Sequence, residues 1–223
     1  LGSDVASFGG QTRRAMEMGQ DRIVRITPDT VQVVDFDGNP EEGKTFEVDW
    51  DVSAAVKGGY DTFMDKEIHE EPMAVAETLR GRTTKDGQLK LDEMRISESV
   101  MRRVDKIIVV ACGTAAYAGH VAKYAIEHWT RIPCEVEIAS EFRYRDPIID
   151  PWTLVVTISQ SGETADTLMA IRHAREQHAK VIAICNTNGA TIPRESDAVI
   201  YTHAGPEIGV ASTKGFTSQI VAC

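Results

Sequence analysis

The chain has 223 residues, of which 42% are hydrophobic and 26% charged, and its formal net charge at pH 7 is −10. A chain of this length can bury a sizeable core in one or two domains, but its acidic balance argues against a nucleic-acid partner, because phosphates attract clustered Lys and Arg. Its strongest apolar runs, such as 107–112, are far shorter than the ~20 residues that span a bilayer, so we expect no membrane segment.

Short β-strands are predicted in the first part of the chain. "RIVRI" and "VQVVDF" are β-branched runs separated by the turn sequence "TPDT", and "DFDGNP" supplies a second turn before "KTFEVDW". These signals predict a β-meander over residues 21–50. Its residues show no pattern that suggests catalytic chemistry of its own.

A helical segment is predicted next, between residues 61 and 80. Apolar side chains recur there near helical spacing, at Met64, Ile68, Val75 and Leu79. We expect Pro72 to open a second helix, because the first turn of a helix does not need the N–H that proline lacks. The sequences "KGGY" before this segment and "GRTTKDGQ" after it are typical of connections.

From residue 105 onward, short apolar runs alternate with longer amphipathic stretches. The expected strands are "KIIVVACG", "CEVEIA", "TLVVTIS", "VIAIC" and "AVIYT", and helices are expected at 116–129 and 164–177. Near-continuous Val, Ile and Leu strands separated by helices indicate a parallel sheet covered on both faces. We therefore predict an α/β fold, a flavodoxin-like three-layer sandwich.

The four cysteines are widely spaced, and three of them lie on or beside the apolar runs. This arrangement is typical of buried free thiols in a reducing cytosol. We therefore expect Cys112, Cys134 and Cys185 to be unpaired and mostly buried, and the protein to be cytoplasmic. Because the chain starts at Leu1 and its first ten residues lack the features of a signal peptide, we expect an internal piece of a longer protein.

The turn "SQSGET", after the third expected strand, is rich in hydroxyl groups. This turn and "CGTAAYAG" each follow a strand and open a helix, where backbone N–H groups and the helix dipole favour an anion. In doubly wound folds, ligands bind beyond the carboxyl ends of the strands. A helix start needs one side-chain cap, so capping explains only one hydroxyl among Ser159, Ser161 and Thr164. The hydroxyls that capping does not explain, together with Gly162, which permits close backbone approach, favour a phosphate site.

Other polar residues near these turns have ordinary explanations. At Gly113 and Thr114, a tight turn with a helix cap accounts for the sequence as well as a ligand does. We expect Glu163 to be exposed, because a carboxylate aimed at a phosphate is repelled. Lys214 could steady a phosphate, but a solvated lysine at a helix start explains it at least as well. The histidines show no metal-ligand spacing, so we expect no metal ion and no cofactor.

Several segments resemble the first sugar-isomerase (SIS) domain of the glutamine:fructose-6-phosphate amidotransferases. They are "ACGT", "CEVEIASEFRYR", "SQSGETADTL", "AICN" and "EIGVASTKGFTSQ". "SQSGET" alone indicates only an SIS domain, whereas "EFRYR" together with "EIGVASTK" identifies the family. "TRRA" and the predicted meander resemble the end of that family's glutaminase domain, and "KEIHEEP" resembles its interdomain segment. The resemblance thus implies a glutaminase remnant at 1–58, an interdomain helical segment at 59–96 and a C-terminally truncated SIS domain at 97–223.

The resemblance implies a binding site for fructose 6-phosphate. It places Ser159, Gln160, Ser161 and Thr164 on the phosphate, with Thr114 beside them. It also places Val210 and Ser212 near the sugar. The family commonly has Ser after "CGT", where this chain has Ala115, so one hydroxyl contact is lost or replaced at this position.

The family's reaction has two halves: a glutaminase releases ammonia, and an isomerase converts fructose 6-phosphate to glucosamine 6-phosphate, the first step of hexosamine synthesis. The resemblance implies a chain that carries the sugar-phosphate loop and no catalytic residue. No cysteine precedes Cys112 to serve as the glutaminase nucleophile, and the family's isomerase base, lysine and histidine lie beyond Cys223. We therefore expect this chain alone to be inactive, and we expect a homodimer through SIS domains.

Two alternatives to the amidotransferase remain. One is a stand-alone SIS module that senses a sugar phosphate, and the other is a simple sugar-phosphate isomerase. The predicted meander before residue 60 favours the amidotransferase, because neither alternative needs it.

Overall fold

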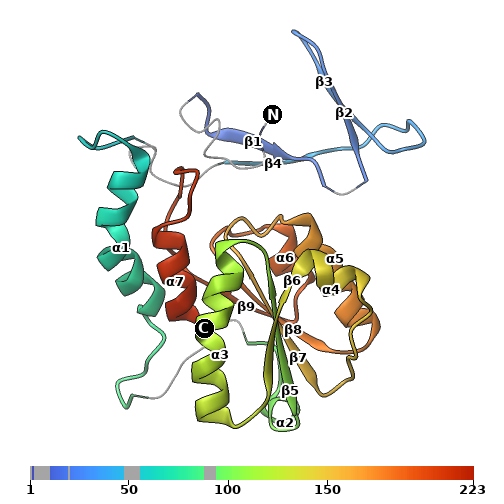
Figure 1. The fold of residues 1–223 in the computed structure, drawn as a ribbon. Helices are drawn as coiled ribbons and strands as arrows, with labels where there is room; N and C mark the ends of the chain where they lie inside the picture. The colour runs from blue at the N-terminus through green and yellow to red at the C-terminus, as the bar shows by residue number, and fades with distance from the viewer. Residues whose placement is uncertain (1, 3–10, 20, 48–55, 88–93) are drawn as a thin grey trace. The chain divides into compact units, whose positions relative to one another are not determined.

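The computed structural model describes residues 2, 11–19, 21–47, 56–87 and 94–223 (Figure 1). The chain divides into two compact units, Leu1–Gly58 and Gly59–Cys223, which are described separately below. No helix in these described ranges is long and apolar enough to cross a membrane.

Two small antiparallel sheets form the first unit. β2 (Ile23–Ile26) and β3 (Val31–Val34) make a hairpin, whereas β1 (Arg14–Glu17) pairs with β4 (Lys44–Glu47). Strands are confirmed in all three predicted runs, although residues 48–50 lie outside the described part of the chain.

The predicted meander is wrong in its last step, because β4 pairs with β1 and not with β3. The turn after β3 closes on itself: Asp35 Oδ1 accepts the N–H groups of Asp37 and Asn39, at 2.9 and 2.8 Å. The chain then continues to a different strand. Sequence analysis missed β1, whose residues "RAME" contain no β-branched or aromatic side chain.

The second unit begins with α1 (Phe63–Leu79), whose start is capped by Thr62, because Thr62 Oγ1 accepts the Asp65 N–H at 3.1 Å. The prediction that Pro72 opens a second helix is wrong, since Pro72 lies inside this single helix. Proline in a helix interior leaves the carbonyl four residues earlier without its donor. Pro72 and Ile68 are both exposed, so that carbonyl can bond to water.

The buried face of α1 is mainly polar. Its buried residues are Lys66, Glu67, Ala74 and Thr78. Met64, Ile68 and Leu79, which predicted the helix, are instead exposed. The polar face meets backbone groups of the chain after β9; Thr78 Oγ1, for example, bonds to the carbonyl oxygen of Thr202.

A five-stranded parallel sheet forms the centre of the second unit. Its strands are β5 (Lys106–Ala111), β6 (Cys134–Ile138), β7 (Thr153–Ser159), β8 (Lys180–Cys185) and β9 (Ala198–Tyr201). Their order is β6-β5-β7-β8-β9, with every neighbouring pair parallel. This is the flavodoxin-like order, in which the direction of winding reverses between β5 and β7. The predicted fold class and all five predicted strands are confirmed.

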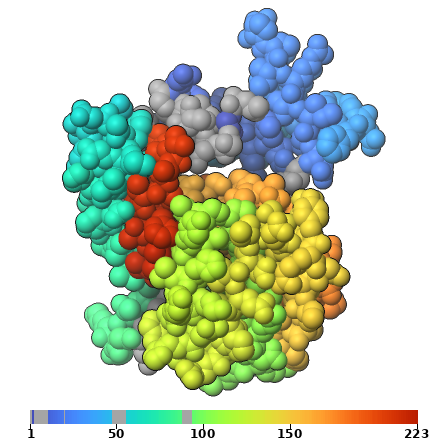
Figure 2. Space-filling model, in the orientation of Figure 1, coloured from blue at the N-terminus to red at the C-terminus, as the bar shows by residue number. Residues whose placement is uncertain are grey.

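Helices cover both faces of this sheet (Figure 1). They are α2 (Glu98–Met101), α3 (Thr114–Thr130), α4 (Ala139–Tyr144), α5 (Ala165–Glu176), α6 (Thr191–Glu195) and α7 (Lys214–Ala222). The predicted helices at 116–129 and 164–177 correspond to α3 and α5. Alternate residues of β5 point to opposite faces: Val109 packs with α3 and α7, whereas Ile108 packs with α4, α5 and α6. In Figure 2, α7 lies between α1 and α3.

Candidate functional site

A pocket of about 240 Å³ opens at the carboxyl ends of β5 and β7, where the strand order reverses. The loop before α7 completes its wall. Its lining residues are Cys112, Thr114, Ala115, Ile158, Ser159, Gln160, Ser161, Thr164, Glu207, Gly209, Val210, Ser212 and Gln219. The structure thus brings together all eight residues that sequence analysis proposed for a sugar-phosphate site, from three separate segments of the chain.

The turn 159–164 is shaped by its own hydroxyl groups. Ser159 Oγ, in a side chain that is almost fully buried, accepts the Gly162 N–H at 3.0 Å and lies 3.1 Å from Thr164 Oγ1. Ser161 Oγ accepts the Glu163 N–H at 3.2 Å. Gly162 has a φ of +69°, which glycine adopts without strain. These contacts hold the turn in a tight curve at the pocket.

Two helix N-termini converge on the pocket. α5 begins after Thr164 and α3 begins after Gly113, and neither start is capped by a side chain. The capping explanation for Ser159, Ser161 and Thr164 is therefore wrong for α5. Uncapped helix starts present backbone N–H groups and the positive end of the helix dipole. This end of the sheet is therefore favourable for an anion.

The loop 205–213 also lines the pocket. Val210 is fully exposed there, and Ser212 Oγ donates to Glu207 Oε2 at 3.1 Å. Glu207 also accepts the N–H groups of Thr213 and Gly215, at 2.8 and 3.0 Å, and so caps the start of α7. Ala115 contributes a methyl group from the first turn of α3.

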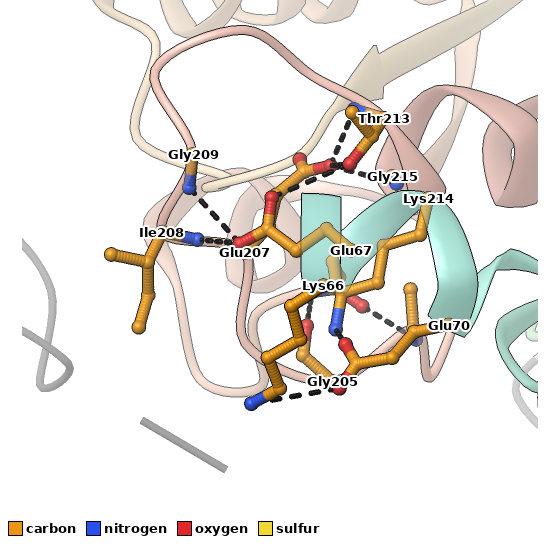
Figure 3. A network of polar contacts seen from close by, with 12 residues as sticks. Lys66, Glu67, Glu70, Gly205, Glu207, Ile208, Gly209, Thr213, Lys214 and Gly215 are labelled. Carbon is orange, nitrogen blue, oxygen red and sulfur yellow. Dashed lines mark hydrogen bonds and ion pairs between the residues drawn. The ribbon is translucent and has the colours of Figure 1, made fainter. Parts of the chain in front are cut away.

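Sequence analysis missed two carboxylates that hold this loop, Glu207 and Glu67 (Figure 3). Glu207 lies seven residues before Lys214, the first residue of α7, so it does not match the pattern of an adjacent N-cap residue. Glu67 could not be found from a local pattern either, because its partners Ile208 and Gly209 lie more than 140 residues later in the chain.

Two charged residues near the pocket have structural partners. Glu163 is exposed, as expected, and its Oε1 accepts the Thr191 N–H at 2.8 Å, at the start of α6. The expectation of a solvated Lys214 is wrong, because this side chain is buried and its Nζ donates to Glu70 Oε2 at 2.6 Å. The buried charge of Lys214 therefore serves an ion pair with α1.

The four cysteines are free. Cys134 and Cys185 are buried, and burial raises the pKa of Cys134 to about 11 and that of Cys185 to about 12. Cys112 is unpaired, as expected, but it follows β5, which ends at Ala111; it is less buried than the other two and lines the pocket.

We expect N-ethylmaleimide at pH 8 to modify Cys112 at least about 100-fold faster than Cys134 or Cys185. Only the thiolate reacts, and a thiol with a pKa of about 11 is ionised to roughly 0.1% at this pH. Burial further restricts the reagent's access to both slow thiols. Peptide mass spectrometry after timed labelling measures each rate in one sample, and denatured protein, in which all thiols react rapidly, is the control. Similar native rates for all three would contradict the burial described here.

No group of three or more His, Cys, Asp or Glu side chains in the described part of the chain is arranged to hold a metal ion. The polar groups that line the pocket are hydroxyls, amides and the carboxylate of Glu207. Hydroxyl and backbone N–H donors suit a phosphate.

Comparison with known proteins agrees with this geometry. Residues 100–223 match the family model described as SIS domain. The glutamine–fructose-6-phosphate aminotransferases (isomerizing) of Corynebacterium diphtheriae and Streptomyces coelicolor are 68% and 67% identical over 222 and 223 residues, and each match covers 100% of this chain but 36% of the relative. A solved structure, the C-terminal domain of glucosamine-fructose-6-phosphate aminotransferase from Francisella tularensis, is 46% identical, with a TM-score of 0.71, over 75% of this chain and 47% of that chain. The resemblance inferred from the motifs is confirmed, and the chain belongs to the SIS domain family.

Proposed function

We propose that the pocket binds fructose 6-phosphate, and that the chain is part of an enzyme that converts fructose 6-phosphate and glutamine to glucosamine 6-phosphate and glutamate. The observation that carries this proposal is the convergence of the hydroxyl-rich turn and two uncapped helix starts on one pocket. The names of the similar proteins support it. The chain spans 36% of the curated relatives' length, so the complete reaction belongs to a longer protein.

In this proposal the residues of the turn bind the phosphate. The hydroxyls of Ser161, Thr164 and Thr114 and the amide of Gln160 donate to phosphate oxygens, and the starts of α3 and α5 supply backbone N–H groups and favourable dipoles. Ser159, which the resemblance also places on the phosphate, keeps the turn in shape through its bond to Gly162.

The loop 205–213 and Ala115 contact the rest of the substrate. Val210 and Ser212 face the sugar, and the methyl group of Ala115 replaces a hydroxyl contact with an apolar one. The role of this chain is to bind and orient the substrate. We assign no proton-transfer residue to it, and we expect it to form no glucosamine 6-phosphate by itself from either glutamine or ammonia.

The sequence resemblance supports three further assignments. Residues 1–58 are the end of a glutaminase domain, residues 59–96 are an interdomain segment, and the SIS domain begins near residue 97. A homodimer through SIS domains is proposed for the longer protein. Free, buried thiols at Cys134 and Cys185 fit a reducing compartment and support a cytoplasmic location.

Calorimetric titration of this chain with fructose 6-phosphate, fructose and inorganic phosphate tests the proposed function. We expect fructose 6-phosphate to bind and fructose not to bind detectably, because most of the donors in the pocket address the phosphate. Fructose 6-phosphate is also expected to slow the labelling of Cys112, which lines the pocket, and to leave Cys134 unaffected. Equal affinities for fructose and fructose 6-phosphate would refute the phosphate site.

A further inference from the structure

Glu67, a residue of α1, places a buried carboxylate against the loop 205–213 (Figure 3). Its side chain is only 2% exposed. Glu67 Oε1 accepts the N–H groups of Ile208 and Gly209, at 2.6 and 3.0 Å, and Oε2 accepts the hydroxyl of Thr213 at 3.3 Å. A carboxylate can be buried when several donors satisfy it, and hydrogen bonds to a charged group are stronger than neutral ones. These contacts therefore fix the backbone of the loop firmly.

The segment that Glu67 holds is part of the pocket wall. Gly209 and Val210 both line the pocket, and the two N–H groups bound by Glu67 come immediately before Val210. Gly209 permits this approach, because a Cβ atom at this position would lie 2.6 Å from Glu67 Oε2. The position of Glu67 therefore determines where the backbone at Val210 lies.

Glu207 holds the other end of the same segment. It accepts bonds from Ser212, Thr213 and Gly215, and Thr213 Oγ1 lies 3.3 Å from both Glu207 Oε1 and Glu67 Oε2. The single hydroxyl proton of Thr213 is thus shared between two carboxylates. Glu207 lies on the loop itself, whereas Glu67 ties the loop to α1.

We propose that Glu67 is a positioning residue of the sugar-binding wall: through Ile208 and Gly209 it sets Val210 and Ser212 at the distance that the sugar requires. This inference rests on the proposed function of the pocket. The family match begins at residue 100, whereas Glu67 lies on α1. A helix that precedes the SIS domain in the sequence therefore completes the SIS domain's own ligand site.

Loss of a negative charge and loss of loop positioning have opposite expected effects on ligand affinity. Removing a negative charge near an anion site strengthens anion binding if charge is the only effect. Glu67→Ala should do the opposite, because it releases the loop. Glu71→Gln is the matched control: it removes one negative charge from the same helix, and Glu71 makes no hydrogen bond to the loop residues that the structure describes.

The experiment titrates the 223-residue chain and its variants with fructose 6-phosphate and with inorganic phosphate, well below the melting temperatures. We expect Glu67→Ala to weaken fructose 6-phosphate binding about 10-fold, the size expected for loss of one good hydrogen bond to a neutral sugar hydroxyl. Inorganic phosphate, which does not reach the sugar wall, should change less than about 3-fold. Glu67→Gln should lie between wild type and Glu67→Ala, since an amide oxygen in the place of Oε1 still accepts the N–H groups of Ile208 and Gly209 but carries no negative charge. Glu71→Gln should bind both ligands at least as tightly as wild type.

Other binding results would overturn either the role of Glu67 or the proposed function of the pocket. Unchanged fructose 6-phosphate affinity in Glu67→Ala would overturn the inference. An equal loss for both ligands would also overturn it, because it would show a general structural role and no specific effect on the sugar wall. If Glu67→Ala does not fold, Glu67→Gln decides by the same ratio of the two affinities. If wild type binds neither ligand, the proposed function itself is refuted, and this result is distinct from a failure of the Glu67 variants.

Discussion

Ser161→Ala is expected to weaken fructose 6-phosphate binding about 10- to 150-fold. Ser161 lines the pocket that the two uncapped helix starts also reach, and a hydrogen bond to a charged group contributes roughly 1.5–3 kcal/mol. Among the described residues, the hydrogen bond of Ser161 Oγ is the one that it accepts from the Glu163 N–H, at the exposed edge of the turn. The cost in folding stability should therefore be small, about 0.5–1.5 kcal/mol. Calorimetry and thermal melting on the same preparation separate the two effects.

Ser196→Ala is the matched control for this prediction. Ser196 is also partly buried and also bonds to a backbone group, the carbonyl of Ile192, but it does not line the pocket. Its replacement should lower stability by a similar amount and leave fructose 6-phosphate binding unchanged. A Ser161→Ala variant that melts early yet binds normally would show that Ser161 only supports the turn.

The central fold was predictable because its sheet is covered on both faces. Strands β5, β7 and β8 are then nearly continuous runs of apolar residues, a pattern that few other structures produce. The same reasoning failed for α1 and β1. α1 buries polar residues because its partners are backbone groups of a distant loop, and β1 lacks the residue types that mark a strand.

The pocket was predictable where one short segment carries both its structure and its chemistry. "SQSGET" and "CGTA" follow neighbouring strands, so their meeting at one edge of the sheet follows from the fold. Val210 and Ser212 were found only through resemblance to a family. Glu67 was not found, because a contact between residues 141 positions apart leaves no local pattern in a single sequence.

Gly162→Ala is expected to destabilise the chain by about 2–5 kcal/mol and to abolish most fructose 6-phosphate binding. Two physical effects combine. The φ of +69° strains any residue with a side chain, at a cost of about 1–2 kcal/mol. In addition, a Cβ atom would lie 2.6 Å from Ala190 Cβ and 3.2 Å from Pro193 Cδ, and overpacking of this kind costs about 1–3 kcal/mol. Urea denaturation measures the loss of stability.

Gly189→Ala separates these two effects. Gly189 has a φ of +74°, so the strain is similar, but a Cβ atom there would have no neighbour within 4 Å. We expect a loss of only about 1–2 kcal/mol and normal fructose 6-phosphate affinity. The difference between the two variants isolates the clash with α6, because the reduced freedom of the unfolded chain is common to both. Ala190 and Pro193 are both buried, so we expect the turn to shift and to weaken the bond from Gly162 N–H to Ser159 Oγ. Equal stability of the two variants, with binding retained in Gly162→Ala, would show that the turn accommodates a side chain and would contradict the clash with Ala190 and Pro193.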